Sequence, residues 1–90
     1  KVVILNALKQ NGLRIYNNSS NPEITITELV VANCGNYAVA AAKSITNANL
    51  HIGTLWHQNC KNLVHGNVKS GISEIKEGLP DFVTAVLSEE

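Results

Sequence analysis

Short apolar runs, separated by turns that contain Asn and Gly, are the feature that most restricts the fold of this chain. The 90 residues include twelve asparagines and six glycines, and both residue types favour turns over regular elements. Two runs, "EITITE" at residues 23–28 and "NLHIGTLWH" at 49–57, alternate apolar and polar residues. Alternation with a period of two is typical of a strand that has one buried face. The pattern therefore predicts a mainly β chain built from many short strands.

Three N-terminal segments are expected to be extended. In residues 1–16, "KVVILNALKQNGLRIY", two apolar runs meet at Asn11 and Gly12, a dipeptide that favours the tight turn of a β-hairpin. In the next segment, alternation through Ile26 gives way to a continuous apolar run, and we expect a β-bulge near Glu28 where the phase changes. Residues 37–49 are rich in alanine, which favours helix, but their position among strands favours a strand.

The C-terminal half is expected to contain further strands and one helix. Alternation at 49–57 places Leu50, Ile52, Thr54 and Trp56 on one face, and two short strands should follow around a turn at 66–67. Apolar residues in 79–87 have helical spacing, so the chain should close with a short helix, although a final strand is the alternative. We detect no internal repeat, and residues 1–90 are expected to form a single compact domain. The fold class predicted is a small antiparallel β-sandwich or barrel of about six strands.

The charge balance argues against two classes of partner. Seven basic and seven acidic residues give a formal net charge of zero, so no basic surface for nucleic acid or an anionic membrane is expected. No apolar run approaches the roughly 20 residues that span a bilayer. We therefore expect neither nucleic acid nor membrane as a partner.

Cys34 and Cys60 are expected to form a disulfide. An even number of cysteines is typical of an extracellular chain, and a loop of this length would contribute roughly 3 kcal/mol to the free energy of unfolding. The absence of methionine, with Lys1 at the start, suggests a mature secreted fragment, and N-x-S patterns at Asn17 and Asn18 would be glycosylation sites on that route.

Two other roles for the cysteines remain open. His57, Cys60 and His65, together with Cys34, would supply the four ligands of a structural zinc ion, but the chain has no C-x2-C pair. Alternatively, His57 or His65 would activate Cys60 as a nucleophile, although no hydrolase or phosphate-loop motif is present. We expect no metal, no cofactor and no catalytic residue.

Several short sequence segments resemble those of a known family. "LHIGTLWHQNCKNLVHGNVKSG", "QNCK" at 58–61, "PDFVTA" at 80–85 and "NPEITITELVVANC" are similar to parts of the MAX effectors, the avirulence and ToxB-like proteins that plant-pathogenic fungi secrete. Cys60 matches the cysteine that opens the family's penultimate strand, whereas Cys34 lies later than the family's first cysteine. The resemblance implies a sandwich of two three-stranded antiparallel sheets, no catalytic site, and delivery into plant tissue to bind a host protein such as an immune-receptor domain.

Two binding functions follow as hypotheses. The first is a secreted, non-enzymatic effector that binds a host protein through an exposed strand edge around Glu23, Thr25 and Thr27. The second is a secreted carbohydrate- or cell-wall-binding module that uses Tyr16, Tyr37 or Trp56 as stacking platforms, although the alternation groups Trp56 with core residues.

Overall fold

The computed structural model describes residues 1–16 and 23–87 as a single sheet of parallel strands with one short C-terminal helix. The elements, in chain order, are β1 (Val2–Leu5), β2 (Leu13–Ile15), β3 (Ile24–Ala41), β4 (Leu50–His65), the 3-10 turn η1 (Lys69–Gly71), β5 (Ile72–Glu77) and α1 (Asp81–Leu87). The strand order is β1-β3-β4-β5, and β2 pairs with the second half of β3. Every strand pair in the described chain is parallel.

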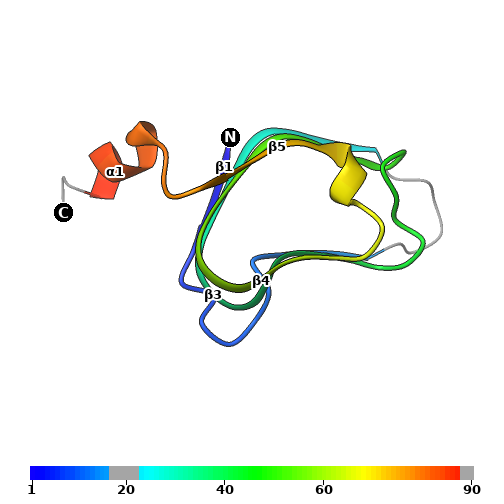
Figure 1. Cartoon of the computed structure of the whole chain (residues 1–90), viewed down its shortest axis with the longest axis horizontal. Coiled ribbons are helices and arrows are strands. Elements are labelled where there is room, and N and C mark those ends of the chain that lie inside the picture. Colours follow the sequence, from blue (N-terminus) through cyan, green and yellow to red (C-terminus); the bar gives the residue numbers. More distant parts are fainter. Residues whose placement is uncertain (17–22, 88–90) are drawn as a thin grey trace.

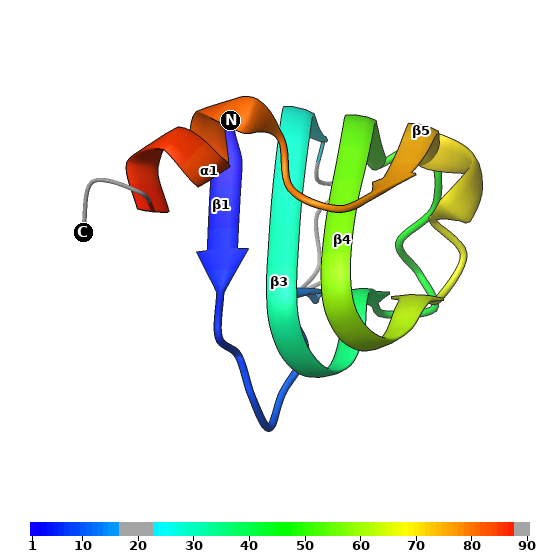
Figure 2. The same ribbon diagram turned by 60° about the vertical axis from the view of Figure 1, so that its left-hand side comes forward.

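The strands follow one another as successive coils of a right-handed spiral (Figures 1 and 2). β1 and β2 belong to the first coil, β3 to the second and β4 to the third, while β5 begins a fourth. Each residue from Ile24 to Cys34 lies beside the residue 26 positions later, as in the Cys34↔Cys60 pair. The chain is therefore a parallel β-solenoid, in which each coil contacts only its neighbours.

The antiparallel sandwich or barrel predicted above is wrong, although the chain is mainly β and does carry a short C-terminal helix. The predicted hairpin is wrong as well, because β1 and β2 both pair with β3 and not with each other. Neither Asn11 nor Gly12 has the positive φ that a hairpin turn of type I′ requires. Instead, the Asn11 side chain accepts a hydrogen bond from the Tyr37 backbone N–H (3.0 Å), and the Gly12 N–H donates to the Tyr37 carbonyl (3.0 Å).

The prediction that the chain has no internal repeat is also wrong. The register aligns "ITEL" at 26–29 with "IGTL" at 52–55 and "ISEI" at 72–75. It also aligns the first two residues of "NCGN" at 33–36 with those of "NCKN" at 59–62, before it shifts by one residue ahead of Tyr37. These segments contain the inward apolar residues and the corners of the coils, whereas the outward residues between them vary. A repeat of this kind is detected only when corner and inward positions are compared separately from the rest.

The phase change near Glu28 marks a corner that recurs in successive coils. Ile26 and Leu29 both pack against the core, so two residues, not one, separate inward side chains at this point, and Ile52 and Leu55 repeat the arrangement in the next coil. Gly53 lies at the corner of β4, where a Cβ atom would come within 2.5 Å of the Thr27 carbonyl oxygen. The break in alternation is therefore present and its cause is a bend of the coil, but the predicted β-bulge near Glu28 is wrong, because the register between β3 and β4 is continuous there and shifts only between Cys34 and Tyr37.

A second corner is formed by a ladder of asparagines. Asn6, Asn33 and Asn59 all have positive φ, between 55° and 65°, which Asn tolerates better than most residues. The Asn33 Nδ2 donates to Asn6 Oδ1 (2.9 Å), and the Asn59 Nδ2 donates to Asn33 Oδ1 (3.0 Å). The ladder turns each coil at the same place and links the three coils through side chains.

The core runs along the inside of the coils. Its fully buried members include Leu29, Val31, Leu50, Ile52 and Leu55, with Ile45 and Val68 contributed by the connecting segments. The alanine-rich segment after Tyr37 continues β3 to Ala41, so the predicted strand is confirmed there. The alternation at 49–57 placed Trp56 in the core, and this prediction is wrong: Leu55 points inward and Trp56 does not belong to the core cluster.

The C-terminal segment folds back over the outside of the sheet. After β5 the chain crosses β4 and β3 to reach β1, where α1 lies (Figure 2). The Gly78 N–H donates to the His57 carbonyl (2.8 Å), and the Lys1 ammonium lies 4.4 Å from the centre of the Phe82 ring. Val83 of α1 is buried, as is Val30, which does not belong to the core cluster.

Replacing the central ladder residue tests the role of the asparagine corner. We expect Asn33→Ala to lower the free energy of unfolding by about 2–4 kcal/mol, because it removes two hydrogen bonds and places a Cβ-bearing residue without a side-chain amide at positive φ. Asn33→Gly should lose only about 1–2 kcal/mol, since glycine tolerates this φ. The exposed Asn47→Ala is the control, with an expected change within about 0.5 kcal/mol in urea unfolding. Equal losses for the Ala and Gly variants would show that the backbone conformation contributes nothing.

Candidate functional site

The two cysteines lie side by side on neighbouring coils, but they are free thiols. Cys34 and Cys60 occupy the same register position of β3 and β4, and the two side chains approach to 3.0 Å without a covalent bond. The predicted disulfide is therefore not present in this structure. The coils around the pair are held by the strand ladder and by the asparagine corner at Asn33 and Asn59, so the fold does not depend on a covalent link at this point.

The environment of Cys34 disfavours its thiolate. Burial, a hydrogen bond with the Cys60 thiol and the proximity of the Cys60 charge together raise the pKa of Cys34 to about 11. Backbone hydrogen bonds with Asn36 and Gly12 lower this pKa and only partly offset these effects. A thiol with a raised pKa is a poor nucleophile at neutral pH.

The structure does not assemble the proposed zinc ligands. Within residues 1–16 and 23–87, no three His, Cys, Asp or Glu side chains lie close enough together to hold a metal ion. His65 instead packs against the Tyr37 ring, with ring centres 5.0 Å apart and planes inclined by 56°. His57 lies beside Val31 in the register, and its carbonyl accepts the hydrogen bond from Gly78.

The predicted partner-binding edge lies at the start of β3. Thr25 and Thr27 are exposed on the outside of the coil and alternate with the inward Ile24 and Ile26, and Glu23 precedes the strand and is exposed. Residues 24–28 pair with β4 on one side, and no described strand pairs with their other side. The backbone of this segment is therefore available to a further strand within the part of the chain that the structure describes.

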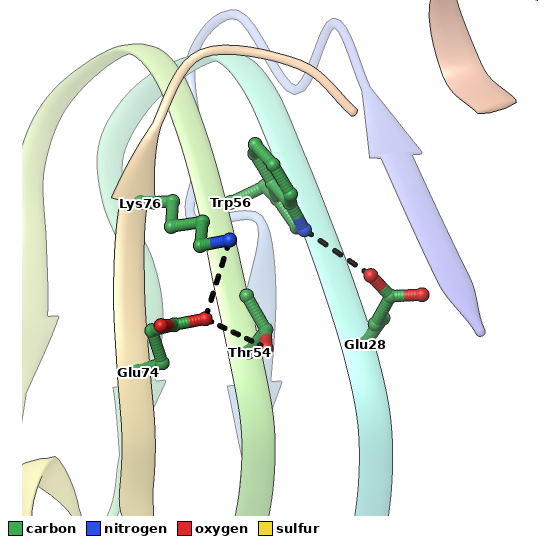
Figure 3. A network of polar contacts seen from close by, with 5 residues as sticks. All are labelled: Glu28, Thr54, Trp56, Glu74 and Lys76. Carbon is green, nitrogen blue, oxygen red and sulfur yellow. Dashed lines mark hydrogen bonds and ion pairs between the residues drawn. The ribbon is translucent and has the colours of Figure 1, made fainter. Parts of the chain in front are cut away.

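Trp56 belongs to a polar network on the outer face of the sheet (Figure 3). We call this surface, over β1, residues 28–32 of β3, residues 54–58 of β4 and β5, the β1 face. The indole Nε1 donates to Glu28 (3.4 Å), and the Lys76 ammonium lies 5.0 Å from the centre of the Trp56 ring. Lys76 also pairs with Glu74 (3.4 Å), which accepts a hydrogen bond from Thr54.

The polar contacts of Trp56 are already made within the protein. Lys76 occupies one side of its ring, and its single donor is already bound to Glu28, which is itself paired with Lys1 (3.7 Å). The charged groups of the β1 face satisfy one another, so little binding capacity remains for a ligand on this face.

Tyr16 and Tyr37, the other two predicted platforms, lie on a different surface. This surface covers β2, residues 37–41 of β3 and residues 62–65 of β4, and we call it the β2 face. The register places Arg14 of β2, Ala40 of β3 and His65 of β4 in one row across the coils. Their neighbours Ile15, Val39 and Ala41 point into the core, so this row points outward. Adjacent strands are about 4.8 Å apart, so Arg14 and His65 stand roughly 9.6 Å apart with only an alanine methyl group between them.

This row forms the floor and two walls of an open groove of about 400 Å³. Arg14 and Tyr16 form one wall, with the guanidinium carbon 4.7 Å from the centre of the Tyr16 ring. Tyr37 and His65 form the other wall, and the small side chains of residues 40–42 form the floor. The volume is within the range of about 300–1,000 Å³ in which proteins bind small ligands.

Asparagine amides border the same groove. The Asn11 Oδ1 accepts from the Tyr37 N–H, and the Asn36 Oδ1 accepts from Asn62 Nδ2 (3.2 Å). Neither the Asn11 nor the Asn36 amide nitrogen has a hydrogen-bond partner among the described residues. Each can therefore donate to a ligand while its oxygen keeps the side chain in place.

Sequence reasoning identified Tyr16 and Tyr37 but missed Arg14, Ala40, His65 and the two asparagines as their neighbours. Arg14 and His65 are 51 positions apart in the sequence, and only the stacking of three coils brings them into one row. The spacing of "NCGN" and "NCKN" would have given the 26-residue offset of residues 24–34, but a register shift before Tyr37 makes the offset 25 at Ala40 and His65. The candidate glycosylation sites Asn17 and Asn18 lie outside the described residues.

Comparison of the chain with protein-family models, with curated proteins and with solved structures gave no match. The resemblance to the MAX effectors therefore rests on the short words quoted above, while the antiparallel sheets that it implied are not those of this chain. Among the described residues, no helix is both long and apolar enough to cross a bilayer.

The raised pKa of Cys34 predicts a loss of stability at alkaline pH. The folded state holds the thiol proton up to pH of about 11, whereas an unperturbed thiol ionises near 9.0, so unfolding releases a proton between these values. The contribution of Cys34 is therefore complete below pH 9 and is lost as the pH rises to about 11. Urea unfolding at several pH values should show a steeper alkaline decline for the wild type than for Cys34→Ala. Curves that decline equally for the two proteins would contradict the raised pKa of Cys34. Because both proteins contain the same Lys and Tyr residues, the difference between the curves reports Cys34 alone.

Proposed function

We propose that this chain is a non-enzymatic carbohydrate-binding module that uses the groove of the β2 face. The observation that carries the proposal is the pair of walls, Arg14 with Tyr16 and Tyr37 with His65, across an alanine floor. Sugars present flat C–H faces to aromatic rings and hydroxyl groups to amides and charged groups. The groove offers both kinds of partner within one open surface.

The fold supports this proposal by fixing the positions of the groove residues before a ligand arrives. The floor and both walls belong to strands or border them, and the strands are held by continuous backbone pairing between coils. A ligand would therefore order few side chains on binding, which lowers the entropic cost of association. Open grooves on rigid sheets also leave both ends free for a longer chain of sugars.

The position of the chain outside the cell belongs to the same proposal. A module that binds extracellular or cell-wall carbohydrate acts where its ligand is, so secretion is a part of this proposal. The binding chemistry described above requires no nucleophile and no catalytic pair of carboxylates, and no Asp or Glu borders the groove. We therefore propose a binding function without catalysis.

Truncating the exposed tyrosine tests the groove directly. Tyr16→Ala should weaken binding of short oligosaccharides by about 0.5–1.5 kcal/mol, roughly two- to tenfold in Kd, because a stacking surface is removed. Titration calorimetry with a panel of neutral and acidic oligosaccharides would measure the change. Val86→Ala on α1 is a matched control, since Val86 and Tyr16 are both 61% exposed. If no member of the panel binds, or if Tyr16→Ala binds as the wild type does, the proposal fails.

A second candidate function is the binding of a host protein, which the open side of residues 24–28 favours. An extended segment of a partner could add to this edge through backbone hydrogen bonds. This arrangement would serve the effector role that the resemblance implies, with a plant immune-receptor domain among the possible partners.

Charged residues at the strand edge test the second candidate. Thr25→Lys combined with Thr27→Lys should abolish capture of a defined partner domain, because lysine on an edge strand opposes pairing with another strand. Lys61→Gln together with Lys69→Gln, on exposed positions of β4 and η1, controls for a change of charge alone. Capture of a panel of plant immune-receptor domains by immobilised protein is the measurement. Equal capture by the edge variant and the wild type would exclude this edge as the binding surface.

A further inference from the structure

The groove of the β2 face is locally basic although the whole chain is neutral. Arg14 lines it, and none of its lining residues is Asp or Glu. The ion pairs of the described residues are Lys1–Glu28 and Lys76–Glu74, both on the β1 face. Arg14 therefore has no carboxylate partner within the described part of the chain.

A second hollow of about 370 Å³ extends the groove past Arg14. It shares Asn11, Arg14 and Asn36 with the first, and Lys9 and Gln10 complete its lining. Again no Asp or Glu contributes. Arg14 thus stands between two connected hollows, with a second cation at the far end.

The position of the Arg14 guanidinium suits recognition of a planar anion. Its carbon lies 4.7 Å from the centre of the Tyr16 ring, so the ring covers one side of the guanidinium and limits its orientations. The N–H groups at the edge of a guanidinium remain able to donate, and their geometry matches the two oxygens of a carboxylate. A lysine at this position would provide charge without that geometry.

We infer that the groove selects sugars that carry a carboxylate, and that Arg14 is the residue that determines this selectivity. The inference rests on the proposed carbohydrate-binding function and adds the ligand class. One sugar stacks between the tyrosine walls, its carboxylate receives two hydrogen bonds from Arg14, and a neighbouring acidic sugar lies toward Lys9. The amide nitrogens of Asn11 and Asn36 donate to ring or hydroxyl oxygens beside the carboxylate.

The experiment measures binding of three oligosaccharides of equal length and linkage to the intact chain. The first consists of hexuronic acid, the second is its analogue with every carboxyl group reduced to an alcohol, and the third carries sulfate on the corresponding neutral sugar. We expect the uronic acid oligomer to bind about tenfold more tightly than the reduced analogue, as a charge-assisted bidentate contact allows. The sulfated oligomer should bind more weakly than the uronic acid oligomer, because a sulfate ester spreads one negative charge over three oxygens and is a weaker hydrogen-bond acceptor than a carboxylate.

Variants assign the selectivity to Arg14. Arg14→Gln should abolish the tenfold preference while leaving binding of the reduced analogue within about twofold of the wild type. Arg14→Lys should retain a reduced preference that disappears in high salt, since a point charge remains. Lys69→Gln removes one positive charge from an exposed turn and should leave the preference intact.

The results distinguish carboxylate selectivity from carbohydrate binding itself. Equal binding of the uronic acid oligomer and its reduced analogue overturns the inference and leaves the carbohydrate-binding proposal standing. Stronger binding of the sulfated oligomer, or a preference that survives Arg14→Gln, also overturns the inference. If none of the three binds, both proposals fail. Circular dichroism of each variant verifies that the fold is retained.

Discussion

The in-register pairing of parallel strands between successive coils is the interaction on which the rest of this structure depends. Once Ile24 lies beside Leu50 and Cys34 beside Cys60, residues at equivalent positions stack along the direction in which the coils accumulate. Apolar residues then form continuous inward rows. Because every coil bends at the same place, a polar residue that tolerates the backbone conformation of the corner recurs once in each coil. The ladder of Asn6, Asn33 and Asn59 is the clearest consequence, because each member satisfies the amide of the next.

Stacking also explains why two outer surfaces of one small chain differ in chemistry. On the β1 face, stacking brings Glu28 of β3 close to Trp56 of β4 and Thr54 of β4 close to Glu74 of β5, and Glu74 pairs with Lys76 on the same strand, so the charges neutralise one another. On the β2 face, the row from Arg14 to His65 contains an alanine and no acidic residue. A small residue between two large ones produces a hollow, and a cation without a partner leaves that hollow basic. Differences of one residue in each coil therefore decide which face can accept a ligand.

The cysteine pair illustrates a further effect of the same constraint. Two cysteines at one register position must be close, whether or not they are bonded, since the neighbouring strands fix the distance between their backbones. Proximity to Cys60, together with burial, raises the pKa of Cys34 and keeps its proton in place. The thiols thus act as small apolar members of the core row, and backbone pairing on both sides of them holds the coils together.

Local patterns were sufficient for some elements and misleading for others. The extended conformation of residues 24–33 and 37–41, the helix at 81–87 and the break in alternation near Glu28 were predictable, because alternation and helical spacing are properties of neighbouring residues, whereas the joining of these segments into one long strand was not predicted. The pairing of β1 and β2 with β3 and the outward position of Trp56 were not predictable, since both depend on contacts with β3 that a local pattern does not contain.

The direction of the strands and the composition of the groove depend on residues that are far apart in the sequence. A strand with period-two alternation buries the same face in a parallel or an antiparallel pair, so the sequence indicated strands without indicating how they pair. The amino-acid order thus established which segments are extended, where the chain bends and which aromatic residues are available. The stacking of coils established that the strands are parallel, that Trp56 faces Glu28 and Lys76, and that Arg14, Tyr16, Tyr37 and His65 share one surface, because residues separated by one or two whole coils become neighbours only after the chain has wound upon itself.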